Sequence, residues 1–145
     1  MKKILTILII ALVSISPIFA QNNSTKKADK LFDRLEFVKA AEEYLKLADK
    51  SPDNYIIGKL ADSYYNIFNT REAEKWYSKI INDDPNAEVV FRYSEMLKAN
   101  GKYKESNVWM SKFSEIKPYD TRAIAFRNAP NYIDKIIKKG KRFNV

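Results

Sequence analysis

Residues 60–85, LADSYYNIFNTREAEKWYSKIINDDP, decide the fold of this chain. In the second half of this stretch, Ala73, Trp76, Tyr77 and Ile80 are spaced i, i+3, i+4 and i+7, which places them on one face of a helix. Another helical stretch precedes them, and Asn69-Thr70 marks a break between the two. The stretch therefore predicts two helices joined by a short turn, with an apolar face that needs a partner.

The same arrangement recurs along the chain at a constant interval, which separates Pro52 from Pro85 and Pro85 from Pro118. We call this interval the repeat period. Breaks like the one at Asn69-Thr70 occur at Glu36-Phe37 and at Asn100-Gly101-Lys102. The repeat period aligns small residues with small ones and large apolar residues with large ones: Ala28, Ala61 and Ser94; Ala40, Ala73 and Ser106; Leu31, Tyr64 and Leu97; Tyr44, Tyr77 and Met110; Leu47, Ile80 and Phe113. Small side chains let two helices cross closely, and larger ones fill the space around the crossing. We therefore expect three helix–turn–helix units, at residues 21–53, 54–86 and 87–120.

This pattern resembles the tetratricopeptide repeat, in which Leu-Gly-x-x-Tyr is followed by Ala-x-x-x-Phe and then by Pro. The middle unit matches best, with Leu60, Ala61, Tyr64, Ala73, Tyr77 and Pro85. The third unit supplies Tyr93, Ser94, Leu97, Gly101, Tyr103, Ser106, Met110 and Pro118, and the first keeps Ala40, Tyr44, Leu47 and Pro52. The first unit departs from the pattern at Lys27, where the family has an apolar residue, and the family's Trp is missing from the first helix of every unit. The resemblance implies an all-α fold of about three repeats in a short right-handed α-solenoid; the alternative is an unrelated helical bundle.

After Asp120 the repeat pattern breaks, because Pro130 falls where an apolar helix residue belongs. We expect capping helices at Thr121 to Arg127 and at Asn131 to Lys139, within a C-terminal segment of residues 121–145 that ends in a basic tail or linker. Acidic and basic residues are equal in number between Gln21 and Asp120. Apart from Lys2 and Lys3, the positive excess therefore lies in this last segment, where only Asp134 opposes Arg122, Arg127, Lys135, Lys138, Lys139, Lys141 and Arg142.

Residues 1–20 have the pattern of a secretory signal peptide. A short basic start at Met1 to Lys3 precedes an apolar run from Ile4 to Val13, and small and turn-forming residues follow before Gln21. The apolar run is shorter than the roughly 20 residues that a membrane span needs, which disfavours an uncleaved anchor helix. We expect an exported protein of the periplasm without an integral membrane span after cleavage, and peripheral association with the outer membrane is left open.

The composition disfavours an enzyme. The chain contains no Cys and no His, so the usual nucleophile and base pairings and the commonest zinc sites are excluded. Asp83-Asp84-Pro85 lacks the spaced ligands of a calcium loop and is interpreted as a turn. We expect no catalytic residue, no metal and no cofactor, and export disfavours nucleic acid as a partner of the basic tail.

The order of the parts is similar to that of a narrower group. The signal-like segment, the KKADKLF opening at residues 26–32, the degenerate repeats and the NAPNY segment at residues 128–132 resemble the N-terminal region of exported OmpA-family proteins of Bacteroidota, including PorE-like components associated with type IX secretion. The resemblance implies a non-catalytic interaction scaffold of the cell envelope that holds a protein or peptide. The alternative is a structural adaptor that anchors an outer-membrane complex to the cell wall through domains absent from this chain.

In the tetratricopeptide family the first helix of each unit lines a concave groove, and this resemblance selects candidate binding residues by position. They are Asp29, Phe32, Asp33, Tyr55, Asp62, Tyr65, Asn66, Glu88, Phe91, Glu95 and Lys98. Aromatic and acidic residues dominate this set, so we expect a neutral or basic peptide segment and no clamp for a C-terminal carboxylate. The alternative is that the aromatic residues pack between units while the acids are solvated.

Overall fold

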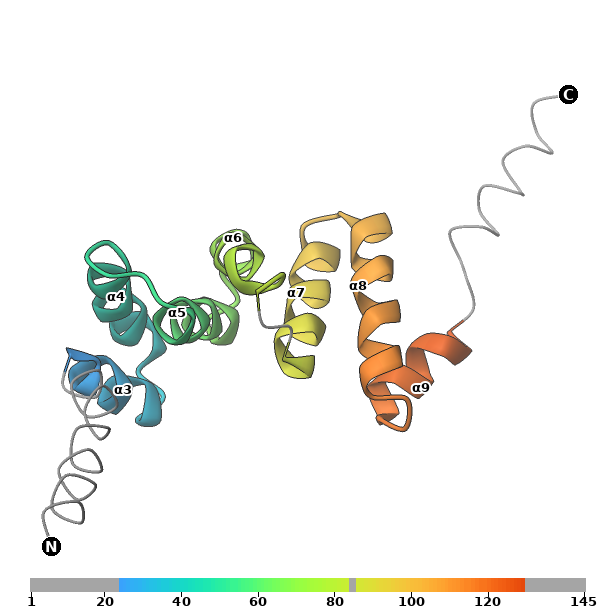
Figure 1. The fold of residues 1–145 in the computed structure, drawn as a ribbon, viewed down its shortest axis with the longest axis horizontal. Coiled ribbons are helices and arrows are strands. Elements are labelled where there is room, and N and C mark those ends of the chain that lie inside the picture. Colours follow the sequence, from blue (N-terminus) through green and yellow to red (C-terminus); the bar gives the residue numbers. More distant parts are fainter. Residues whose placement is uncertain (1–23, 84–85, 130–145) are drawn as a thin grey trace, which may run out of the picture. The chain divides into compact units, whose positions relative to one another are not determined.

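The computed structural model describes residues 24–83 and 86–129, and within these ranges the chain forms seven α-helices and no strand (Figure 1). The chain divides into two compact units, Met1–Pro85 and Asn86–Val145. The first unit contains α3 (Lys26–Asp33), α4 (Phe37–Ala48), α5 (Asn54–Asn66) and α6 (Thr70–Ile80). The second contains α7 (Ala87–Ala99), α8 (Tyr103–Ile116) and α9 (Thr121–Asn128). The all-α prediction is confirmed, and the boundary between the units lies where the second and third predicted repeats meet.

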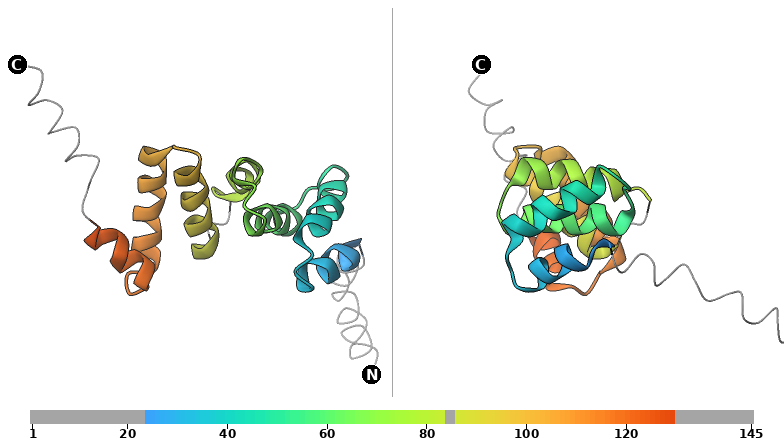
Figure 2. Two further views of the ribbon diagram at one scale, coloured as in Figure 1. Left: turned by 180° about the vertical axis from the view of Figure 1, so that it is seen from behind. Right: turned by 90° about the vertical axis from the view of Figure 1, so that its left-hand side faces the viewer.

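The helix ends that flank the hairpin turns follow the repeat period to the residue. The helices α3, α5 and α7 end at positions 33, 66 and 99, and α4, α6 and α8 begin at positions 37, 70 and 103. In each unit, helices that are consecutive in the chain pack against one another, as the two views of Figure 2 also show for α3 with α4 and for α7 with α8. The predicted breaks are therefore the turns of three helical hairpins.

All three hairpin turns have one backbone geometry. Leu35, Phe68 and Gly101, which are one repeat period apart, have positive φ angles of 62°, 57° and 81°. In each turn the N–H of this residue donates to the carbonyl at i−3, and the next N–H donates to the carbonyl at i−5, at 2.8–3.0 Å. This is the Schellman ending of a helix, for which glycine is the usual left-handed residue. Only one of the three turns has glycine, so Leu35 and Phe68 take up a conformation that L-residues adopt at a cost.

The small residues of the repeat lie where the helices meet. None of the six aligned positions is more than 5% exposed: Ala28, Ala61, Ser94, Ala40, Ala73 and Ser106. Large residues of the aligned set fill the interior around them, and Tyr44, Tyr77, Leu97 and Phe113 are fully buried. The buried residues of α6 are Ala73, Trp76, Tyr77 and Ile80, as the helical spacing predicted. These burial predictions are confirmed.

A helix is present where one was expected at Thr121 to Arg127: α9 begins at Thr121, and the Asp120 side chain accepts a hydrogen bond from the backbone N–H of Arg122 at its N-terminus. Pro52 and Pro118 follow the ends of α4 and α8. Four predicted features lie outside the described residues: the signal peptide, Pro85, the helix expected at Asn131 to Lys139 and the end of the basic tail. None of the described helices is both long and apolar enough to cross a membrane.

Candidate partner-binding faces

In the first unit, side chains of α3 and α5 meet on one surface. Asp29 and Phe32 are spaced i, i+3 on α3, and Tyr55 and Lys59 are spaced i, i+4 on α5, so each pair lies on one side of its helix. The Tyr55 hydroxyl donates to Oδ1 of Asp29 at 2.8 Å, and Nζ of Lys59 lies 4.0 Å from the centre of the Phe32 ring. We call these four residues the α3–α5 face. Three of them belong to the predicted groove set, and Lys59 is an addition.

The Asp29 carboxylate is the shared hydrogen-bond acceptor of this face. Besides Tyr55, its carboxylate accepts hydrogen bonds from the Tyr44 hydroxyl at 2.5 Å and from the Thr25 hydroxyl at 2.7 Å. Burial acts to raise the pKa of Asp29, but the three hydrogen bonds together outweigh it and hold the pKa below its ordinary value. Burial and the bond to Asp29 raise the pKa of Tyr55 to about 12. The face therefore presents an ionised carboxylate and a neutral tyrosine hydroxyl at neutral pH.

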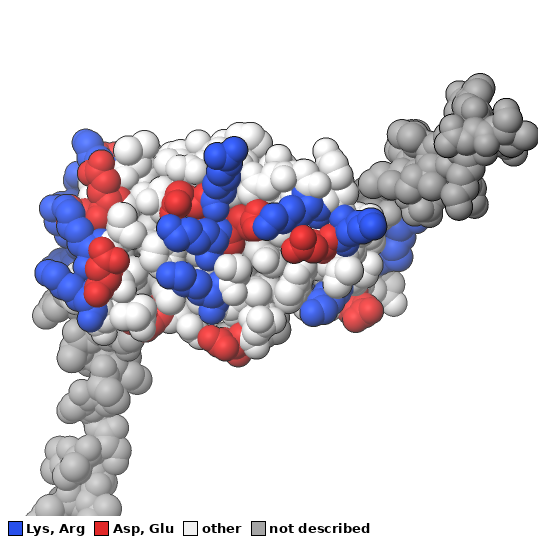
Figure 3. Space-filling model, turned by 90° about the horizontal axis from the view of Figure 1, so that it is seen from above, with Lys and Arg blue, Asp and Glu red and all other residues white. Residues whose placement is uncertain are grey.

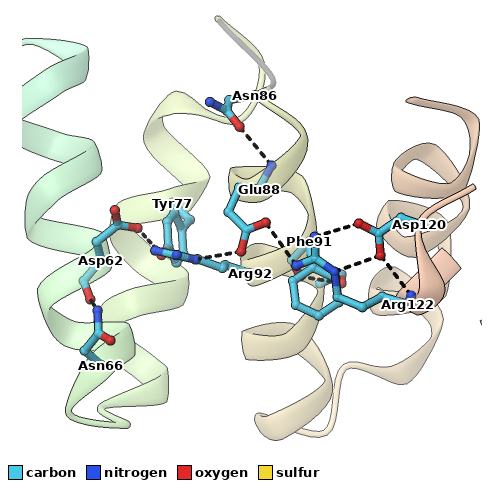
Figure 4. Close-up of polar contacts among 10 residues, drawn as sticks. Asp62, Asn66, Tyr77, Asn86, Glu88, Phe91, Arg92, Asp120 and Arg122 are labelled. Atoms are coloured by element: carbon cyan, nitrogen blue, oxygen red, sulfur yellow. Dashed lines mark hydrogen bonds and ion pairs between the residues drawn. The ribbon is translucent and has the colours of Figure 1, made fainter. Parts of the chain in front are cut away.

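The Asp29–Tyr44 bond is repeated in the next hairpin. The Tyr77 hydroxyl donates to Oδ1 of Asp62 at 2.6 Å, and both partners lie one repeat period after their equivalents (Figure 4). In the third hairpin the tyrosine is replaced by Met110, whose sulfur lies 3.5 Å from the hydroxyl of Ser94. From the sequence, the tyrosines were interpreted as packing residues, and these carboxylates were missed as their partners. The available signal was the equal spacing between aspartate and tyrosine in the two hairpins.

The other predicted residues of α5 and of the end of α3 do not share one set of contacts. The ring of Tyr65 packs edge to face on the ring of Tyr77 with 6.4 Å between centres. Asn66 donates from its side chain to the backbone carbonyl of Asp62 at 2.7 Å, and Asp33 is exposed. The structure thus brings Asp29, Phe32 and Tyr55 together on one face. Of the other predicted residues of α5, Asp62 and Tyr65 contact Tyr77 of α6, while Asn66 bonds within its own helix.

In the second unit, the predicted residues Glu88 and Phe91 of α7 are in contact with Arg122 of α9. The guanidinium carbon lies 4.2 Å from the centre of the Phe91 ring and 5.0 Å from that of the buried Phe113. One terminal nitrogen of the guanidinium donates to Oε2 of Glu88 at 3.0 Å, and the other donates to Oδ2 of Asp120 at 2.9 Å (Figure 4). Arg122 therefore joins α9 to α7 through stacking and through charged hydrogen bonds.

Asp120 holds Arg122 from within its own segment. Its carboxylate also accepts from Nε and from the backbone N–H of Arg122, at 3.0 and 2.9 Å. The side-chain and backbone hydrogen bonds from Arg122 lower the pKa of Asp120 to about 2. From the sequence, Arg122 was counted in the positive excess of the last segment, and in the structure its charge is paired with Asp120 and Glu88. The remaining predicted residues of α7 are the partly exposed Glu95 and the exposed Lys98.

Acidic and basic side chains lie intermixed on the face drawn in Figure 3, in keeping with the balanced charge of the sequence before Asp120. Within the part of the chain that the structure describes, no group of three or more Asp or Glu residues is placed to hold a metal ion. Comparison of the chain with protein-family models and with curated proteins finds no match. The case for a function therefore rests on the geometry of the two units.

Proposed function

We propose that this chain is a non-catalytic interaction module made of tetratricopeptide-like repeats, and that it holds a segment of another protein in the bacterial cell envelope. The periodic recurrence of helix ends, left-handed turns and buried small residues supports the repeat assignment. The absence of His and Cys from the sequence supports a binding role over a catalytic one. Export rests on the signal-peptide pattern of residues 1–20, and an association with type IX secretion and the link to OmpA-family assemblies rest on the sequence resemblance.

The α3–α5 face carries this proposal, and Tyr55 is its decisive residue. Tyr55 is 50% exposed, yet its hydroxyl is fixed by Asp29, which is itself held by Tyr44 and Thr25. An exposed aromatic ring that is already ordered offers contact area without the entropy loss of immobilising a side chain on binding. Such preordered aromatic residues are typical anchors of protein interfaces.

The charge of the face points to a neutral or basic partner segment. Asp29 is ionised, Asp33 is exposed close to Tyr55, and the one cation of the face, Lys59, lies over the Phe32 ring. A carboxylate-bearing partner would be repelled by the two aspartates, whereas a Lys or Arg side chain would be attracted. The partner is therefore expected to place an apolar or aromatic side chain near Tyr55 and Phe32 and a cation near Asp33.

A selection from a random peptide library against the purified chain tests this function. The affinity of the selected peptides is then measured for Tyr55→Ala and for Tyr103→Ala, because Tyr103 on α8 is equally exposed, at 51%. We expect Y55A to weaken binding by roughly tenfold or more, as for an interface hot spot, and Y103A to leave it unchanged. A library that yields no binder, or equal losses in the two variants, would refute the proposal for this face.

A further inference from the structure

The helix α9 packs against α8, and Arg122 carries its contacts to α7. All residues of α9 are described, and Ala123 alone among them is buried, with Arg122 and Phe126 partly buried. Ala123 contributes little apolar area, because its side chain is a single methyl group. The stacking of Arg122 on Phe91 and its bond to Glu88 are thus the principal specific contacts between α9 and α7.

The contacts of Arg122 divide into those that would remain if α9 left α7 and those that would be lost. The bonds to Asp120 join Arg122 to a residue of its own segment and would move with it. Only the bond to Glu88 and the stacking on Phe91 and Phe113 belong to the α7–α8 hairpin. A guanidinium from outside could make these same contacts while Arg122 kept Asp120 as its partner.

We propose that Glu88, Phe91 and Phe113 form a binding site for an arginine side chain of the partner segment, and that Arg122 of α9 fills this site in the free chain. This inference rests on the proposed function, because it assigns an occupant to two residues of the predicted binding set. The partner's arginine and Arg122 are competitors, so the Arg122 side chain leaves the site when the partner binds.

The geometry selects arginine over lysine. The guanidinium carbon lies 4.2 Å from the centre of the Phe91 ring, while a nitrogen at the edge of the same group reaches Glu88 at 3.0 Å. A planar group with several donors satisfies a ring and a carboxylate together, whereas an ammonium is a compact and strongly hydrated point charge. A neutral group of the same shape lacks the attraction to both the ring face and the carboxylate.

The test removes the internal competitor and supplies the ligand group in solution. N-acetyl-arginine amide is titrated into the full chain and into its Arg122→Ala variant, and binding is followed by NMR shifts of Phe91 and Phe113. N-acetyl-citrulline amide is the neutral probe of matched shape, and Arg127→Ala is the control, because Arg127 lies on the same helix and donates instead to the carbonyl of Pro118. We expect R122A to bind the arginine probe at least about tenfold more tightly than the wild type and R127A, since a site that is open in one molecule in ten or fewer weakens apparent binding by that factor.

The neutral probe and a change in the site itself give two further tests of the proposal. R122A should not respond to the citrulline probe, and the Phe91→Ala change added to R122A should abolish the response to arginine. Equal affinity of wild type and R122A for arginine, or an equal response to citrulline, overturns the proposal. Loss of the native α7 and α8 signals in both R122A and Arg122→Gln also overturns it, because the site must persist without Arg122.

The same samples separate this proposal from the proposed function. Peptides selected from the library are added to R122A, and the effect of Y55A on their affinity is measured again. If the peptides bind through Tyr55 while the arginine probe does not bind R122A, the arginine site fails and the interaction module stands. If no peptide binds the wild type or R122A, the proposed function itself is refuted.

Discussion

The left-handed turn residue of each hairpin provides the sharpest test of the repeat geometry. Leu35, Phe68 and Gly101 share one backbone conformation, although only Gly101 is the residue type that prefers it. We predict that glycine is more stable than alanine at all three positions. The comparison of glycine with alanine removes the side chain beyond Cβ in both variants, so that it isolates the backbone.

The magnitude follows from two opposing contributions. A left-handed conformation destabilises an L-residue by about 1–2 kcal/mol, and the greater freedom of glycine in the unfolded chain offsets about 0.5–1 kcal/mol of that difference. Gly should therefore exceed Ala in unfolding free energy by about 0.5–1 kcal/mol. Leu35 and Phe68 are 71% and 72% exposed, and a Cβ on Gly101 would meet no atom within 4 Å, so packing adds little at any of the three positions.

Urea unfolding followed by tryptophan fluorescence measures the difference unit by unit. Trp76 is buried in the unit that contains Leu35 and Phe68, and Trp109 lies in the unit that contains Gly101. Replacing one tryptophan by Phe leaves a reporter for the other unit, and an unchanged dependence on urea shows that the variants unfold from the same compact state.

The exposed Glu42, in the middle of α4, is the control position, because the stability difference between glycine and alanine should be reversed there. There alanine should exceed glycine by about 1 kcal/mol, as in an ordinary helix. If Ala equals or exceeds Gly in stability at Leu35 or Phe68, the turn geometry assigned to the first two hairpins is wrong.

Three further predictions concern the interior and α9. Tyr77→Phe removes the hydrogen bond to the Asp62 carboxylate and should destabilise the first unit by about 1–2 kcal/mol in thermal unfolding. Ala61→Leu forces a larger side chain into a fully buried crossing and should destabilise by about 1–3 kcal/mol in urea, whereas Leu at the exposed Ala125 should change stability by less than about 0.5 kcal/mol. Because the pKa of Asp120 is lowered to about 2 in the folded chain, its stabilising effect is complete above about pH 4 and disappears as the pH falls through about 2. The protection of the α9 amides against hydrogen exchange, relative to their intrinsic exchange rate at each pH, should fall over that window.

The hairpins could be predicted from the sequence because they depend on local properties that recur. A helix face, a small residue at a crossing and a break between helices each have a signature of a few residues, and the repeat period supports each signature with its equivalents in the other units. The predicted face of α6 therefore agrees with the observed one residue for residue.

The contacts of the candidate faces could not be predicted in the same way, because they join residues of different helices. Helical spacing says which side a carboxylate lies on, but not which hydroxyl or guanidinium reaches it. Asp29 meets Tyr55 and Glu88 meets Arg122 across long stretches of chain, and neither separation is a feature of the repeat pattern. The left-handed Leu35 and Phe68 also violate local preference, since the packing of the flanking helices decides the turn.

The most direct test of the proposed interaction module is to find where a bound segment lies. A peptide selected against the chain is given a photoreactive side chain and crosslinked, and the modified residues are identified by mass spectrometry. We predict crosslinks to exposed residues of α3 and α5 around Tyr55 and Phe32. Crosslinks confined to α4 and α6 would contradict the proposal, because those helices would then hold the partner.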